Sequence, residues 1–216
     1  MLGFDVTIFK EPRSQLIRKI LLVCFGEILL GFGIVFNSSA GFGNDSVTVF
    51  YDGLHKTIGV SFGFATNMIN ITLLIILLFL GRKYINIGTL IYALPLGSII
   101  NFAFKVYPVF NLSYTMSGRI ASAVIGCLLL FVSLSCFVAA QIGVDPWNGV
   151  TLVLCDKTGM QYRVLKILID VATLFIGLAL GGSAGVTTVI AAILGGPLIQ
   201  QISQWMRKFI LEPQKT

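Results

Sequence analysis

Charged side chains that interrupt long apolar stretches are the residues of this sequence best suited to chemistry. Glu27 lies within ILLVCFGEILLGFG, and Lys166 and Asp170 lie one helical turn apart within VLKILIDVATLF. Charged groups at membrane depth usually face a protein interior or a water-filled path. Lys166 and Asp170 can pair along one helix, so a structural and a functional role are both open for them. Glu27 has no such neighbour, and we expect it to carry a proton or bind a cation.

Amide side chains form a second polar set within the apolar stretches. Asn67 and Asn70 share one helical face, Asn101 lies further along the chain, and Gln200 and Gln201 lie near its end. Amides of this kind either fasten helices together or contact a substrate, and both alternatives stand. The predicted substrate or ion path comprises Glu27, Asn67, Asn70, Asn101, Lys166 and Asp170.

A Gly-x-Asp turn occurs twice. Aspartate at a helix start accepts hydrogen bonds from free backbone N–H groups, glycine allows a sharp entry turn, and proline fits the first helical position. The turns can therefore be helix caps and no more. Alternatively, each turn dips into the membrane, so that two positive helix N-termini hold an anion or a polar substrate group. The residues concerned are Gly43, Asp45, Gly143, Asp145, Pro146 and Trp147.

The two turns belong to a longer internal sequence repeat at a spacing of 100 residues. Glycine and aspartate matches are more informative than leucine matches in an apolar chain, because turn and cap chemistry is specific. Gly43, Asp45, Leu54, Gly59 and Gly81 recur as Gly143, Asp145, Leu154, Gly159 and Gly181. A spacing of 98 later places Thr89 on Thr187. The pattern indicates an old duplication, which is common in membrane transporters.

Composition indicates an integral membrane protein. Of 216 residues, 56% are hydrophobic and only 11% are charged, which is too few charges to cover a soluble globule. A helix of roughly 20 apolar residues crosses the hydrocarbon core. Short helices are expected at SVTVFYDGLHKTI and PWNGVTLVLCDKT. Six spans are predicted near Ile20–Phe36, Phe62–Leu80, Ile87–Phe104, Ile120–Ala140, Val164–Leu180 and Val186–Met206.

Basic residues indicate the orientation. With a cytoplasmic N-terminus, only Lys56, Lys105 and Arg119 of the 15 Lys and Arg residues lie outside, as the positive-inside rule requires. The lipid bilayer also accounts for the net charge of +6 better than nucleic acid does. Three spans per copy is an odd number, so the copies must be inverted. The predicted fold is therefore an all-α membrane protein with six transmembrane helices as a 3+3 inverted repeat and two short interfacial or re-entrant helices.

The expected domain organisation follows the two copies. A cytoplasmic segment precedes the first three-helix repeat, an extracellular linker joins the repeats, and a cytoplasmic tail ends the chain. The boundaries are 1–18 for the N-terminal segment, 19–105 and 119–206 for the repeats, 106–118 for the linker and 207–216 for the tail.

Two pairs of motifs resemble a known family. The paired turns read SAGFGNDSVTVF and AAQIGVDPWNGV, and the Gly-Thr helix starts read IGTLIYALPLG and AGVTTVIAAILGG. With these motifs the chain resembles the YczE/YyaS/YitT group of bacterial membrane proteins, and the YczE branch most. The resemblance covers about Arg18 to Ile210 and implies a multi-pass protein of the bacterial cytoplasmic membrane. Ser46 and Val47 replace the Pro-Trp of the family pattern, so the two halves are not expected to keep equivalent sites.

The function expected from these features is transport of an unknown small solute along a polar path between the two halves. One alternative is a membrane factor that supports a partner protein or product secretion, and another is a substrate-capturing subunit of a larger transport complex. A homodimer is compatible with this size. No nucleophile triad, metal-ligand spacing or nucleotide-binding loop is present in the sequence, so neither an enzyme nor a cofactor or metal is expected.

Overall fold

The computed structural model describes residues 13–211, which form helices joined by turns, without a strand. Predictions that concern residues 1–12 and 212–216, including most of the N-terminal segment and half of the tail, lie outside these residues. The longer helices are α1 (Arg13–Ala40), α3 (Phe62–Leu80), α6 (Met116–Ala140), α8 (Tyr162–Ala179) and α9 (Val186–Met206). The shorter elements are α2 (Ser46–Ile58), η2 (Arg82–Tyr84), α4 (Ile87–Ala93), α5 (Leu96–Val106), η3 (Tyr107–Phe110), η4 (Leu112–Tyr114), α7 (Pro146–Thr158) and the π-helical η5 (Arg207–Leu211).

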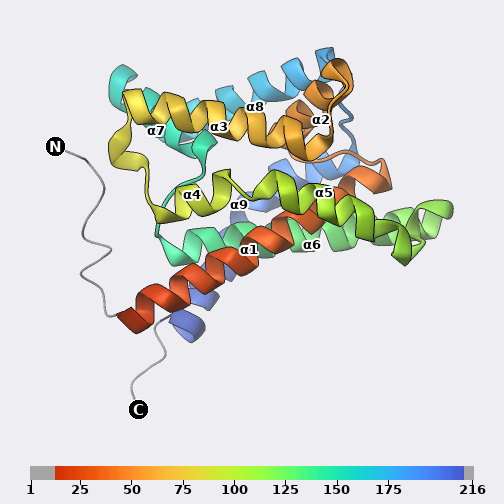
Figure 1. Cartoon of the computed structure of the whole chain (residues 1–216), viewed down its shortest axis with the longest axis horizontal. Helices are drawn as coiled ribbons and strands as arrows, with labels where there is room; N and C mark the ends of the chain where they lie inside the picture. The colour runs from red at the N-terminus through yellow and green to blue at the C-terminus, as the bar shows by residue number, and fades with distance from the viewer. Residues whose placement is uncertain (1–12, 212–216) are drawn as a thin grey trace.

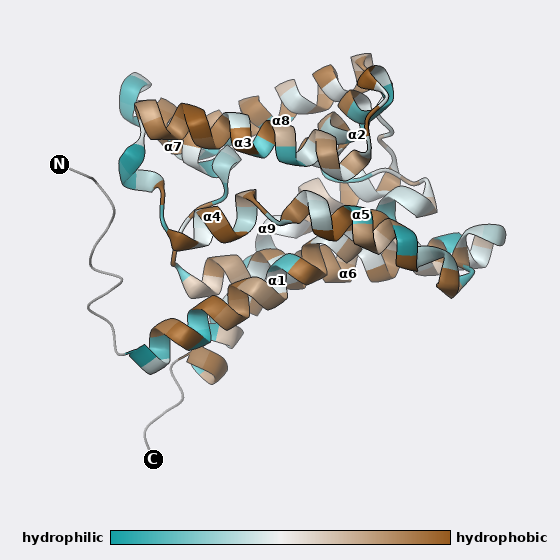
Figure 2. Cartoon of the chain, in the orientation of Figure 1, coloured by the Kyte–Doolittle hydropathy of each residue, from teal (hydrophilic) through white to brown (hydrophobic). Residues whose placement is uncertain are grey.

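Five segments are long and apolar enough to cross a membrane, by length and composition. They are Arg13–Ala40, Phe62–Leu80, Ile87–Phe110, Met116–Ala140 and Val186–Leu211. The fifth predicted span corresponds to α8, whose 18 residues include Arg163, Lys166 and Asp170, and it is not among the five. Figure 2 shows hydrophobic residues along the long helices and hydrophilic residues at several helix ends. The prediction of an all-helical chain with several apolar helices is confirmed.

The span predicted at 87–104 consists of two helices. Helix α4 ends at Ala93, and Pro95 precedes the first residue of α5. Proline has no backbone N–H and disfavours helical geometry in the residue before it, so the hydrogen-bond ladder is interrupted there. The break allows α5 to begin with free N–H groups in the middle of the apolar segment.

The helices form two groups, which Figure 1 shows one above the other. In the first group, α1 packs closely along α6, α5 packs on α1, and α9 packs on α6. Glycines bring α1 and α6 together: a Cβ on Gly26 would lie 2.8 Å from the Cβ of Cys136, and one on Gly126 would lie 2.5 Å from the Asn37 amide oxygen. Helix–helix contacts in membranes rely on such small residues.

In the second group, each short helix packs on a long helix from the other half of the sequence. Helix α2 packs mainly on α8, and α7 packs on α3, so each contact joins the first half of the sequence to the second. The α2–α8 contact is tight, because a Cβ on Gly53 would lie 2.4 Å from the Gly177 carbonyl oxygen. The Lys83 ammonium, hydrogen-bonded to Asp156, and the Tyr84 hydroxyl hold the pKa of Asp156 below its usual value, and they tie η2 to the end of α7.

The Gly-x-Asp turns fasten the two groups at two matching places. The Phe42 carbonyl accepts a hydrogen bond from Thr187 N–H at 3.1 Å, and the Ile142 carbonyl accepts one from Gly88 N–H at 3.0 Å. Gly43 and Gly143 adopt φ angles of +92° and +154°, which glycine tolerates best.

Two threonines have the same capping role beside these turns. The side chain of Thr89 accepts from Asn86 N–H, and that of Thr188 accepts from Gly185 N–H. The structural counterpart of Thr89 is therefore Thr188 and not Thr187, because capping follows hydrogen-bond geometry rather than residue identity alone.

One helix pair breaks the correspondence between the halves. Helix α3 packs closely on α5, whereas α8 and α9, at the corresponding places in the second half, make almost no contact. A Cβ on Gly97 would lie 2.0 Å from the Gly63 carbonyl oxygen, while one on Gly196 would have no atom within 4 Å. The two helix pairs thus differ in how closely they pack.

Candidate functional site

Both predicted helix caps are present. Asp45 accepts a hydrogen bond from Thr48 N–H at 3.3 Å, and Asp145 accepts one from Asn148 N–H at 3.0 Å. Both aspartates are partly buried, at the starts of α2 and α7.

An aromatic bridge joins the two short helices. Trp147 Nε1 donates to the Tyr51 hydroxyl at 2.8 Å, and this hydroxyl donates to the Asn70 amide oxygen at 2.8 Å. The rings of Phe50 and Trp147 meet edge to face, with centroids 5.9 Å apart. Tyr51 is 1% exposed, so its two hydrogen bonds are buried. The structure thus brings together Trp147 and Asn70, which the sequence had placed in separate sets.

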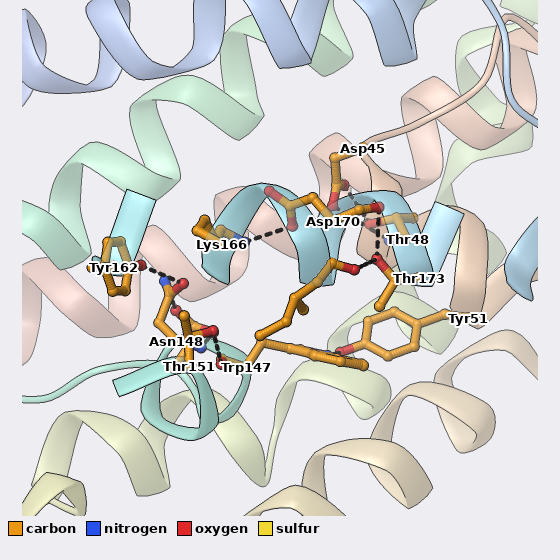
Figure 3. A network of polar contacts seen from close by, with 12 residues as sticks. Asp45, Thr48, Tyr51, Trp147, Asn148, Thr151, Tyr162, Lys166, Asp170 and Thr173 are labelled. Carbon is orange, nitrogen blue, oxygen red and sulfur yellow. Dashed lines mark hydrogen bonds and ion pairs between the residues drawn. The ribbon is translucent and has the colours of Figure 1, made fainter. Parts of the chain in front are cut away.

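Helix α8 contributes an ion pair beside the caps. Lys166 Nζ and Asp170 Oδ1 are 2.7 Å apart, so the predicted pairing within the helix is confirmed. Lys166 is also close enough to act electrostatically on the carboxylates of Asp45 and Asp145. Figure 3 shows the labelled side chains of α2, α7 and α8 lying together.

A further bond fixes α8 to α7. The Tyr162 hydroxyl donates to the Asn148 amide oxygen at 2.8 Å, and Asn148 in turn bonds the Asp145 carboxylate. The cap of α7 is therefore connected to α8 through one amide side chain. This connection holds the two helix ends in register beside the ion pair.

Glu27 is the most unusual residue near this cluster. Its side chain belongs to α1 and is 1% exposed, and neither carboxylate oxygen has a hydrogen-bond partner in the described part of the chain. Asp145, Tyr51 and Tyr92 lie within its electrostatic range. An ionised carboxylate buried without a partner costs several kcal/mol. Glu27 therefore needs a proton or a cationic ligand.

Asn67 and Asn101 lie apart from this cluster and hold α3 to α5. The Asn67 amide oxygen accepts from Gly97 N–H at 2.8 Å, and the Asn101 amide oxygen accepts from Gly63 N–H at 3.1 Å. Gly63 and Gly97 are second residues of their helices, where backbone N–H groups lack helical partners. Each asparagine thus caps the other helix. For these two residues the geometry matches the structural alternative.

The remaining predicted amides show a different environment. Gln200 and Gln201 are exposed on α9, the helix that makes almost no contact with α8. The described residues also contain site members that sequence reasoning missed, namely Phe50, Tyr51, Tyr92, Asn148 and Tyr162. The polar groups of the three tyrosines, set in apolar or short helices, were the signal that could have indicated them.

Acidic and aromatic side chains from separate helices converge around the starts of α2 and α7, and we call this cluster the central site. It is defined by Glu27, Asp45, Phe50, Tyr51, Asn70, Tyr92, Asp145, Trp147, Asn148, Tyr162, Lys166 and Asp170.

Comparison with known proteins places the chain in a family. A family model described as a family of unknown function (DUF6198) matches residues 17–204. The chain is 22% identical over 189 residues to the uncharacterized membrane protein YczE of Bacillus subtilis (strain 168), a match that covers 87% of this chain and 86% of YczE. It is 25% identical over 182 residues to the uncharacterized protein YyaS of the same organism, covering 84% and 90%.

A third relative comes from another organism. An uncharacterized protein of Haemophilus influenzae (strain ATCC 51907 / DSM 11121 / KW20 / Rd) is 20% identical over 183 residues, covering 85% of this chain and 82% of the relative. No solved structure gives a significant match. The apolar helices, the family match and the similarity to YczE and YyaS together show that this chain is a multi-pass membrane protein of the DUF6198 family.

Proposed function

We propose that this protein transports a small solute across the bacterial cytoplasmic membrane, through the central site. The observation that carries the proposal is the meeting of two short helices from separate halves of the sequence. Their capped N-termini lie deep in the protein, joined by the Trp147–Tyr51 hydrogen bond and flanked by the Lys166–Asp170 pair. Half-helix ends that meet at mid-membrane beside polar groups are typical of transporter binding sites.

The proposed membrane arrangement has six crossings in a 3+3 inverted repeat. Helix α8 is the sixth crossing, because its Lys166–Asp170 pair offsets much of the cost of placing two charges at depth. Helices α2 and α7 are re-entrant and end at opposite faces. The 12 to 3 distribution of Lys and Arg supports cytoplasmic termini. Matching contacts at Phe42–Thr187 and Ile142–Gly88 support the repeat.

The difference between the α3–α5 and α8–α9 pairs supports alternating access. In an inverted repeat, two states arise when the halves exchange conformations. Helix α3 packs closely on α5, whereas α8 and α9 make almost no contact, and we interpret these pairs as closed and open. In the proposed orientation, the open pair leads from the central site toward the cytoplasm. The second state would close α8 on α9 and release α3 from α5.

Glu27 has the role of proton carrier or cation ligand in this mechanism. It is buried, has no hydrogen-bond partner in the described part of the chain, and lies within electrostatic range of the α7 cap. A carboxylate in this state changes its interactions when a proton or cation binds, which can bias one of the two states.

Uptake into liposomes that contain the purified protein tests this proposal. A broad solute panel identifies the substrate, and Glu27→Gln is expected to abolish its uptake while leaving protein abundance unchanged. Ser133→Ala is the matched control, because the Ser133 hydroxyl is also buried without a partner in residues 13–211 and the Ser133 carbonyl lies beside Gly26. Inactivity that persists until a co-purified partner protein is added would instead support a partner-dependent factor or a capturing subunit.

A further inference from the structure

Acidic side chains outnumber basic ones in the central site. Four carboxyl groups, from Glu27, Asp45, Asp145 and Asp170, belong to it, and among residues 13–211 the side chain of Lys166 acts on both caps as a cation. Opposite charge within a few ångströms favours binding, and the effect is stronger away from bulk water. The charges of the site therefore suit a cationic ligand.

The N-termini of α2 and α7 do not favour an anionic ligand. A free helix N-terminus attracts anions through its unpaired N–H groups and partial positive charge. In α2 and α7, however, Asp45 and Asp145 already accept from those N–H groups. An anionic ligand would have to displace a capping carboxylate and approach three others. The alternative of an anion site at the two turns is therefore disfavoured.

Glu27 supplies the second, independent sign of a ligand. Its two oxygens are buried and lack hydrogen-bond partners among residues 13–211, whereas Asp45, Asp145 and Asp170 each have a hydrogen-bonded partner. A buried acceptor without a donor is rare in folded proteins. Glu27 lies in electrostatic range of Asp145, Tyr51 and Tyr92, which belong to the central site. Its carboxylate is thus the vacant acceptor of this site.

The arrangement suits an organic cation better than a metal ion. Among residues 13–211, no three His, Cys, Asp or Glu side chains converge as metal ligands. The aromatic rings of Phe50, Tyr51 and Trp147 contact one another. Carboxyl groups of Glu27, Asp45 and Asp145 lie close enough to Tyr51 to act on it electrostatically. Ammonium groups with hydrocarbon substituents bind well to aromatic faces near carboxylates.

We propose that the central site binds an organic ammonium ion, with Glu27 as its principal counter-ion. The proposal rests on the transport function above and names its substrate class. The ammonium N–H or N–CH₃ groups face the Glu27 carboxylate, and the substituents contact the aromatic bridge between α2 and α7. Lys166 occupies the edge of the site and balances Asp170.

Thermal unfolding of the full chain in detergent micelles tests the ligand class. The probes are methylammonium, tetramethylammonium, choline and putrescine chlorides, each compared with sodium chloride and sodium acetate at equal ionic strength. A bound ligand raises the stability of the folded state, so at ten times its Kd at least one probe is expected to raise the unfolding midpoint by about 3 °C or more. Glu27→Gln should remove the rise, and Ser133→Ala should keep it.

Several results would overturn this ligand class. They are silence of all four ammonium probes, an equal rise with sodium chloride, a rise specific to acetate, or a rise that survives in Glu27→Gln. Uptake measurements separate this inference from the transport proposal. Ammonium binding without transport of the bound probe would retain the site and reject transport, whereas Glu27-dependent uptake of a neutral or anionic solute would do the reverse.

Discussion

At the scale of single residues, the acidic groups of the central site have different states. Asp45 and Asp145 are helix caps with hydrogen-bonded partners, and Asp170 is paired with Lys166. Glu27 has no hydrogen-bond partner among the residues that the structure describes. The same side-chain chemistry therefore has three different roles within one region. A carboxylate that is already satisfied contributes charge and local structure, whereas an unsatisfied one can take a ligand.

Substitution of Asp145 separates its capping role from its charge. Asparagine caps a helix about as well as aspartate, whereas alanine loses about 1 kcal/mol of stability. We expect Asp145→Asn to keep the unfolding midpoint and Asp145→Ala to lower it. If the charge of Asp145 attracts the ligand, both variants bind the ligand more weakly. The ligand-dependent rise in the unfolding midpoint measures this loss. An Asn variant that binds and transports like the wild type would limit Asp145 to capping.

At the scale of the elements, two corresponding helix pairs differ in their contact. The α3–α5 pair is held by backbone contact between Gly63 and Gly97 and by the reciprocal caps from Asn67 and Asn101. The corresponding α8–α9 pair lacks this contact. Arg163 and Ile167 replace Gly63 and Asn67 at a spacing of 100 residues, so the second half does not carry the same fastening residues.

Alanine substitution at matched glycines measures this difference. Gly97→Ala is expected to lower the free energy of unfolding by about 1–3 kcal/mol, because its Cβ would lie 2.0 Å from the Gly63 carbonyl oxygen. Gly196→Ala is the control: its Cβ meets no atom within 4 Å, and alanine favours a helix over glycine by about 0.5–1 kcal/mol. Thermal unfolding of both variants in micelles checks this. Equal losses at the two positions would contradict the open α8–α9 pair.

At the scale of the whole molecule, the partner exchange of α2 and α7 couples the two halves. Helix α2 packs on α8 and α7 packs on α3, while α1 and α6 form the most extensive contact. Movement of either short helix must therefore move a long helix from the other half. This interlocking suits a protein in which two halves rock around a shared central site.

Cysteine labelling tests the proposed orientation. In a Cys24→Ala background, which removes the exposed native cysteine, Tyr114→Cys should react with an impermeant maleimide from outside intact cells. Thr158→Cys, at the exposed end of α7, should react only in inside-out vesicles. Because the two sites lie at opposite faces in the inverted arrangement, each is the control for the other. Labelling of both cysteines from the same side would reject the inverted arrangement.

The sequence predicted the features that depend on nearby residues. The short helices at 46–58 and 146–158 match α2 and α7 residue for residue, because an aspartate cap and a following glycine define both ends locally. The Lys166–Asp170 pair is similarly local, one turn apart on α8. The interruption at Pro95 was readable in principle, since proline disfavours a continuous helix, but hydropathy alone merged the two pieces into one span.

Only the tertiary structure decided which polar residues share a site. Asn67 and Asn70 lie three residues apart on one helix. Asn67 nevertheless caps α5, whereas the Asn70 amide oxygen accepts a hydrogen bond from the Tyr51 hydroxyl. Residue type and spacing could not separate a structural role from a role in the site, because the partner of an amide depends on the helix that packs beside it. The sequence by itself determined the helices, their caps and the isolated charge of Glu27. The packing of α2 on α8 and α7 on α3 decided that acidic and aromatic groups converge, since contacts between distant segments depend on the whole fold.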